Sequence, residues 1–304
     1  MVSVGAEAEP PVFAGDLRPE VERQVFAGDL RRETDSLQRR ARAALRHAPL
    51  GGAFVSAYLT VVVLIPIAAL VAQAGGAFAQ GGGWAAVTNP QTLAALELTI
   101  STAVLVALAN AVVGLATAWV LVRDDFPGRR LLDAIIDLPL ALPTIVAGVT
   151  LLTLYGPGSP IGLNIAYTRA AITLALLFVT FPFVVRSVQP VLQVLDPEVE
   201  AAARSMGAGG WTLFRHILLP QLMPAVISGA ALAFARGLGE YGAVVLLSGN
   251  IPFQTQLTSV YIFGDVEQGD TADAAAISLV LLLLTLAVLV AADVFRRRYT
   301  ANAQ

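Results

Sequence analysis

Residues 200–220 read EAAARSMGAGGWTLFRHILLP, and this segment lies between two long apolar runs of the chain. It contains Glu, His, two Arg and three Gly residues, whereas the 304-residue chain as a whole is 56% hydrophobic and only 13% charged. Soluble domains are about 25% charged on average. A polar segment in so apolar a chain indicates a membrane protein in which residues 200–220 lie outside the lipid.

Six runs of the sequence are long and apolar enough to cross the hydrocarbon core, which takes a helix of about 20 residues. We expect helices, because a backbone in lipid must satisfy its own hydrogen bonds and the alternating pattern of barrel strands is absent. The sequence therefore predicts an all-α polytopic membrane protein with six transmembrane helices. The expected spans are residues 53–72, 93–122, 131–155, 170–190, 224–248 and 274–292.

The placement of arginine predicts the orientation of these spans. With the N-terminus inside, thirteen Arg residues lie in or beside the inner segments, and only Arg169 lies in an outer loop. Cytoplasmic loops carry the excess of positive charge in membrane proteins. Both termini and residues 200–220 are therefore expected in the cytoplasm. The acidic outer loop, 249–273, is either a solvated surface or a contact for an extracytoplasmic partner.

The chain divides into a polar tail at residues 1–48, a first transmembrane helix at 49–75 and a five-helix core at 92–298. The tail repeats VFAGDLR at 12–18 and 25–31, and its mixed charge favours disorder or a loosely held surface helix. We expect no cleavable signal peptide, since the first apolar run comes after 48 polar residues.

Several kinds of chemistry are excluded by composition. The chain has no Cys, two distant His residues and no Lys, because all 19 basic residues are Arg. Thiolate metal sites and disulfides are impossible, and the lysine of an ATP-binding phosphate loop is missing. We therefore expect a protein that is not an enzyme and binds no cofactor or metal of its own.

A short helix is predicted just before the opening segment. Asp196 is a good N-cap, Pro197 suits the first helical position and Gly207 is a natural stop. An apolar stripe is expected on this helix at Val199, Ala202, Ala203 and Met206. A second helical piece is expected at 211–218, before Pro220 and Pro224 break the chain. Because such a helix is too short to be stable alone, it must dock on its own bundle or on a cytoplasmic partner.

This segment resembles the signature of ABC-importer permeases: Glu-Ala-Ala, three residues, Gly, nine residues, then Ile-x-Leu-Pro. Gly207 and Ile217–Pro220 match the spacing, whereas Ala201 stands at the Glu position and Glu200 lies one residue early. In that family the element is a coupling helix that sits in a groove of the ATPase subunit. The resemblance implies such a helix at about 196–218, with docking residues Glu198, Glu200, Ala201, Ala202, Ala203, Met206, Gly207, Ala208 and Phe214.

Residues 137–156, DLPLALPTIVAGVTLLTLYG, and 234–263 are similar to permeases of oxyanion importers, and 255–282 most resemble the T-type permeases of sulfate/thiosulfate importers. The resemblance covers residues 50–298 and implies a type I importer in the inner membrane. Its implied partners are a second homologous permease, two ATPases that use ATP and Mg, and an extracytoplasmic sulfate-binding protein. A molybdate/tungstate permease, a stand-alone secondary anion transporter and a non-transport scaffold are the alternatives.

Ionisable groups inside a span usually face a bundle interior or a cavity. Arg236 and Glu240 lie four residues apart in the fifth span and can form an internal ion pair or a gate. Asp133 and Asp137 are expected to cluster with Arg123, Arg129 and Arg130, and Asn110 to bond a neighbouring helix. The candidate translocation path or gate comprises Arg236, Gly239, Glu240, Gly242, Ser248 and Asn250.

Overall fold

The computed structural model describes residues 51–301 as helices joined by turns, with no strand in that part of the chain. The described residues fall into two units, which divide between Ala68 and Ala69. The described residues of the first unit belong to a helix that runs from Gly51 to Ala79. The predicted polar tail, residues 1–48, lies outside the described residues.

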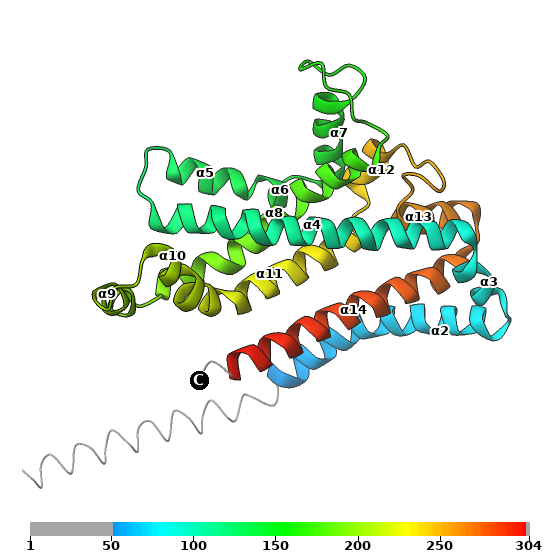
Figure 1. Cartoon of the computed structure of the whole chain (residues 1–304). Coiled ribbons are helices and arrows are strands. Elements are labelled where there is room, and N and C mark those ends of the chain that lie inside the picture. Colours follow the sequence, from blue (N-terminus) through cyan, green and yellow to red (C-terminus); the bar gives the residue numbers. More distant parts are fainter. Residues whose placement is uncertain (1–50, 302–304) are drawn as a thin grey trace, which may run out of the picture. The chain divides into compact units, whose positions relative to one another are not determined.

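The helices of the described chain follow one another with short connections (Figure 1). Their bounds are η1 Thr60–Leu64, α2 Ile65–Ala79, α3 Gly82–Thr88, α4 Pro90–Arg123, α5 Arg129–Ile136, α6 Leu138–Ala141, α7 Thr144–Tyr155, α8 Arg169–Val194, α9 Pro197–Ser205, α10 Gly210–Leu213, η2 Phe214–Leu218, α11 Leu219–Leu238, α12 Gly242–Ser248, α13 Thr258–Gln268 and α14 Thr271–Ala301.

Within residues 51–301, five helices are long and apolar enough to cross a membrane, and a bent pair makes a sixth if it counts as one span. The bent pair joins Arg129–Ala141 to Thr144–Tyr155 at an angle of 112°. Leu142 is extended in front of Pro143, the conformation that a following proline favours. The predicted all-α class is confirmed, and the third expected span, 131–155, is bent next to Pro143. The five unbroken helices are Gly51–Ala79, Pro90–Arg123, Arg169–Val194, Gly210–Leu238 and Thr271–Tyr299.

Two predicted helix ends are wrong. Helix α8 passes through Pro182 and continues beyond Pro190, where the expected span 170–190 ends, and the helix from Gly210 to Leu238 passes through Pro220 and Pro224. A proline removes one helical hydrogen bond but does not force an end where packed neighbours hold the backbone, as the buried Val188 and Leu192 do on either side of Pro190. The wider turn of η2 precedes Pro220. The fifth span breaks instead between α11 and α12, at residues 239–241.

Helices α4, α8 and α11 pack together along their lengths, and α12 crosses α7 (Figure 1). One apolar cluster lies where α7, α8 and α12 meet and includes Ile172, Leu176 and Leu247. A second lies between α4, α8 and α11 and includes Val188 and Leu222. This bundle positions the C-terminal end of α4, which α9 contacts. It also positions residues 239–241, the break between α11 and α12 that contains Glu240.

Candidate docking helix and translocation site

Helix α9 forms through the capping signals of its sequence. The Asp196 side chain accepts a hydrogen bond from the backbone N–H of Glu198 at 2.8 Å, and Pro197 occupies the first turn. Gly207 follows the helix with a φ of +87°, a left-handed conformation that only glycine adopts without strain. The predicted short helix is therefore present, between residues 197 and 205.

The predicted apolar stripe of α9 is wrong, because its members do not share one environment. Ala203 is buried against Leu213 and Leu218, whereas Val199 and Met206 are 45% and 81% exposed. Successive residues of a helix differ by about 100° around the axis, and here the neighbours Ala202 and Ala203 fall on opposite sides of the edge of the contact with the bundle. Ala203 faces the bundle, and the exposed face holds Glu198, Val199, Ala201, Ala202 and Met206.

Glu200 also faces the bundle. Its side chain is buried, and Oε1 lies 2.5 Å from Nη2 of Arg123, the last residue of α4. Arg204 is more distant, at 3.8 Å from Oε2. Glu200 thus joins α9 to a span, which the sequence could not indicate, because the two charges are 77 residues apart.

The rest of the predicted docking set divides between surface and packing. Gly207 is exposed. Ala208 is partly buried and packs against the apolar cluster of Ala203, Leu213 and Leu218. Phe214 contacts Trp119 edge-to-face, with centroids 5.4 Å apart, and stacks on Trp211 at 5.7 Å. Phe214 is therefore a packing residue that joins η2 to α4.

Arg236 and Glu240 form the predicted ion pair, with Nη2 and Oε2 2.8 Å apart. Oε2 has no hydrogen bond of good alignment, so this contact is mainly electrostatic. The other carboxylate oxygen accepts the N–H of Ala243 at 2.9 Å, and the Glu240 backbone carbonyl accepts from the Ser259 hydroxyl at 2.6 Å. Glu240 is fully buried and caps the first turn of α12 at the break in the span.

The remaining residues of the predicted path lie around α12. A Cβ on Gly242 would lie 2.2 Å from Thr144 Oγ1 and 2.9 Å from the Ile145 backbone nitrogen, so α12 crosses α7 at contact distance. Gly239 has open space around it. Ser248 is buried at the far end of α12 and accepts the N–H of Asn250, which is exposed. The structure thus brings Arg236, Glu240 and Gly242 together, but places Ser248 and Asn250 at the other end of α12.

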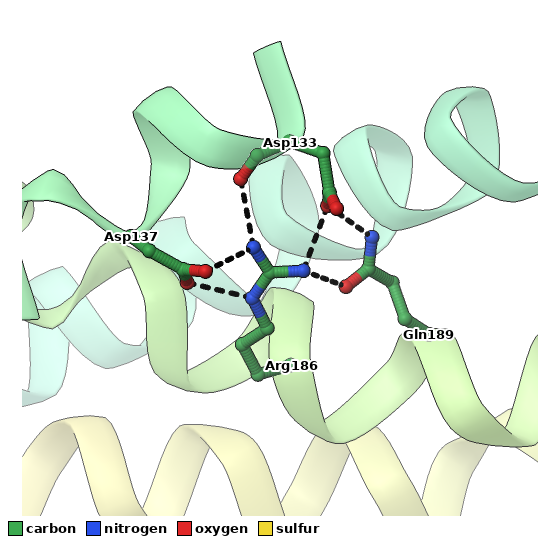
Figure 2. Close-up of polar contacts among 4 residues, drawn as sticks. All are labelled: Asp133, Asp137, Arg186 and Gln189. Atoms are coloured by element: carbon green, nitrogen blue, oxygen red, sulfur yellow. Dashed lines mark hydrogen bonds and ion pairs between the residues drawn. The ribbon is translucent and has the colours of Figure 1, made fainter. Parts of the chain in front are cut away.

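A charged cluster around Arg186 replaces the one expected from the sequence (Figure 2). Asp133 and Asp137 pair with Arg186 of α8, while Arg123 pairs with Glu200 and Arg129 with Asp125. Sequence proximity favoured the arginines of the 123–130 segment, but one turn of α8 carries both Arg186 and Gln189 to the carboxylates.

All five N–H groups of Arg186 are used in this cluster. Nε donates to Asp137 Oδ1 at 2.7 Å, and Nη2 donates to Asp137 Oδ2 at 2.6 Å. Nη2 also donates to the Asp133 backbone carbonyl at 2.7 Å. Nη1 donates to Asp133 Oδ1 at 2.7 Å and to Gln189 Oε1 at 2.5 Å. The cluster therefore fastens α5 and the start of α6 to α8, as Figure 2 shows.

Asn110 of α4 donates a hydrogen bond to the Thr180 hydroxyl of α8 at 2.8 Å, which confirms the predicted bond between helices.

Asp265 lies in α13, within the acidic segment 249–273, and its side chain is buried. Among the described residues, Oδ2 of Asp265 has no hydrogen-bond partner. Burial, then the charges of Asp273 and Asp270, raise the pKa of Asp265 to about 6.

The helix arrangement is shared with solved ABC transporters. A crystal structure of a bacterial ABC transporter involved in the import of the acidic polysaccharide alginate matches 85% of this chain and 99% of its own, with a TM-score of 0.68 and 18% identity. The same transporter in complex with an alginate pentasaccharide-bound periplasmic protein matches with a TM-score of 0.67, 18% identity and coverage of 85% and 96%. The described helices therefore have the fold of these ABC transporter chains.

Residues 110–301 match the family described as the binding-protein-dependent transport system inner membrane component, and the chain belongs to this family. It is 48% identical over 241 residues to a probable sulfate transport system permease protein cysT of Nephroselmis olivacea, covering 77% of this chain and 84% of that one. It is 42% identical over 250 residues to the sulfate transport system permease protein CysT of Escherichia coli, with coverage of 80% and 90%.

Proposed function

We propose that this chain is a membrane-spanning subunit of an ATP-driven importer that carries sulfate into the cytoplasm, with both termini on the cytoplasmic side. The observation that carries the proposal is the identity of 42–48% to sulfate permeases over more than three quarters of the chain. Thiosulfate is expected to share the path. A sister permease completes the pore, and a periplasmic binding protein delivers the anion.

The exposed face of α9 is the proposed contact with an ATPase subunit. This face offers small side chains at Ala201 and Ala202 and the exposed thioether of Met206, so another protein surface can approach closely. The helix is fastened on its other side through Ala203 and Glu200. Because the chain has no Lys for a phosphate loop, the ATPase supplies the ATP and Mg chemistry.

The break between α11 and α12 is the proposed polar element of the path. Arg236 keeps a third of its side chain exposed, while its partner Glu240 is buried and occupied in capping α12. The pair is neutral in sum and therefore cannot hold a dianion tightly. A passage of this kind suits an importer in which selection is made by the binding protein.

The proposal is tested by reconstituting this chain with its ATPase, sister permease and binding protein in vesicles. We expect uptake of radiolabelled sulfate that requires ATP and is reduced by thiosulfate more than by molybdate. Uptake by this chain alone would show a secondary transporter and end the proposal.

Docking is tested with Gly207→Asp, which places a charge beside the exposed face of α9. We expect loss of ATPase co-purification with normal membrane insertion. Gly269→Asp is the matched control, because Gly269 also has a positive φ and open space around it but lies after α13. Equal ATPase recovery with both variants would contradict the docking assignment.

A further inference from the structure

We infer that the ion pair between Arg123 and Glu200 is the link through which the docking helix α9 moves the span α4. The inference rests on the proposed docking of an ATPase on α9. It assigns both side chains as positioning residues, since neither touches the transported anion.

Glu200 is suited to this task by its direction. It points away from the exposed face of α9 and keeps only 10% of its side chain exposed, whereas Glu198 in the same turn is exposed. An ATPase bound to the exposed face therefore does not compete for Glu200. Its carboxylate remains available to a charge on the bundle.

Arg123 is held at the contact by its own neighbours on α4 and by Glu200. Its guanidinium carbon lies 5.4 Å from the centre of the Trp119 ring, on which the cation rests, and its Nε is buried without a hydrogen-bond partner. Glu200 is the more buried partner, with 10% of its side chain exposed against 26% for Arg123. A buried charge that loses its partner is strongly disfavoured. When α9 shifts, Arg123 must therefore follow Glu200, or the carboxylate of Glu200 is left uncompensated.

Helix α4 carries the movement onward because it is continuous over 34 residues from Arg123 back to Pro90. Near its other end, the Thr99 hydroxyl accepts the N–H of Thr258, the first residue of α13, at 2.9 Å. Gln91 donates to Gln256 at 2.7 Å, just before α13. The same helix thus holds α9 at one end and the start of α13 at the other.

The test uses the full importer in vesicles and compares Glu200→Gln with Glu97→Gln. The matched control removes an exposed carboxylate of α4 that lies outside the face proposed to contact the ATPase. We expect Glu200→Gln to keep ATPase co-purification and basal ATP hydrolysis. Sulfate uptake and the stimulation of hydrolysis by the binding protein should fall by about 5- to 150-fold, the usual range of coupling between sites. Glu97→Gln should behave as wild type.

The charge exchange Arg123→Glu with Glu200→Arg separates linkage from folding. If the pair transmits movement, the exchange should restore most of the uptake that Glu200→Gln loses. Unchanged uptake per ATP in Glu200→Gln, loss of ATPase binding in that variant, or an exchange variant that inserts but stays uncoupled would each overturn the inference. A wild-type chain that fails to bind the ATPase would instead contradict the proposed function.

Discussion

At the scale of single residues, a shift of one position changes what a charge does. The permease signature places Glu at the position of Ala201, and in this chain the neighbouring Glu200 carries the charge. Because successive helical residues differ by about 100° in direction, Ala201 is exposed while Glu200 turns inward to Arg123. The exposed face of α9 consequently lacks a carboxylate at position 201, and the bundle gains an ion pair.

The stability of the folded protein should depend on pH through Asp265. Its pKa is raised from 3.8 to about 6, so the folded state binds its proton more tightly than the unfolded chain does. The contribution of Asp265 to the free energy of unfolding is therefore fully present below pH 3.8 and is lost as the pH rises through about 6. Asp265→Asn should raise stability above pH 6 by an amount of the order of 2 kcal/mol.

The measurement is the thermal unfolding midpoint of the purified protein in detergent between pH 4 and pH 8. Glu267→Gln, on the exposed side of the same helix, is the control and should follow the wild-type curve. Parallel curves for wild type and Asp265→Asn would rule out this role for the buried carboxylate.

At the scale of elements, glycine decides how closely α12 crosses α7. Gly242→Ala would place a Cβ against Thr144 and the Ile145 backbone, and overpacking of this kind costs about 1–3 kcal/mol. We expect a lower unfolding midpoint and reduced uptake. Gly239→Ala changes the same residue type three positions earlier, in open space, and should leave the unfolding midpoint nearly unchanged. Similar losses in both variants would mean that the crossing is not the cause.

The Arg186 cluster should not tolerate lysine. An ammonium group has three N–H donors and no planar fork, so it cannot reproduce five hydrogen bonds to Asp133, Asp137 and Gln189. Arg186→Lys is therefore expected to lower the free energy of unfolding by about 1–3 kcal/mol.

The comparison is with Arg129→Lys, which keeps the exposed pair with Asp125 and should change stability by less than about 0.5 kcal/mol. Both variants are followed by thermal unfolding in detergent. A neutral Arg186→Lys would show that α5 and α6 are held to α8 mainly by apolar contacts.

Local signals predicted helix α9, because Asp196, Pro197 and Gly207 act through neighbouring backbone atoms. Long apolar runs likewise predicted the spans. The inward direction of Glu200 and the partner of Asp133 were not predictable, since both depend on residues dozens of positions away. The expected fourth span ends at Pro190, whereas helix α8 continues to Val194, because tertiary packing outweighs the local preference of proline.

At the scale of the whole molecule, the arginine distribution predicts which surfaces face the cytoplasm. The chain has no Cys, so single-cysteine variants can be labelled without background. Met206→Cys and Phe253→Cys replace residues that are 81% and 58% exposed. With an impermeant maleimide, Met206→Cys should react only in inverted vesicles and Phe253→Cys only in right-side-out vesicles. The reverse pattern would invert the topology.

The length of α4 has a consequence for the lipid environment. Its 34 residues make it about 51 Å long, against a hydrocarbon core of about 30 Å. Its polar residues Thr99, Thr102 and Asn110 are buried against protein, whereas the hydroxyls of the exposed Ser101 and the half-buried Thr117 donate to backbone carbonyls of α4 itself. A change of tilt thus leaves none of these polar groups unpaired in the acyl chains. The helix can therefore adapt to hydrophobic mismatch in thicker or thinner bilayers by tilting, while both of its fastened ends stay clear of the membrane interior.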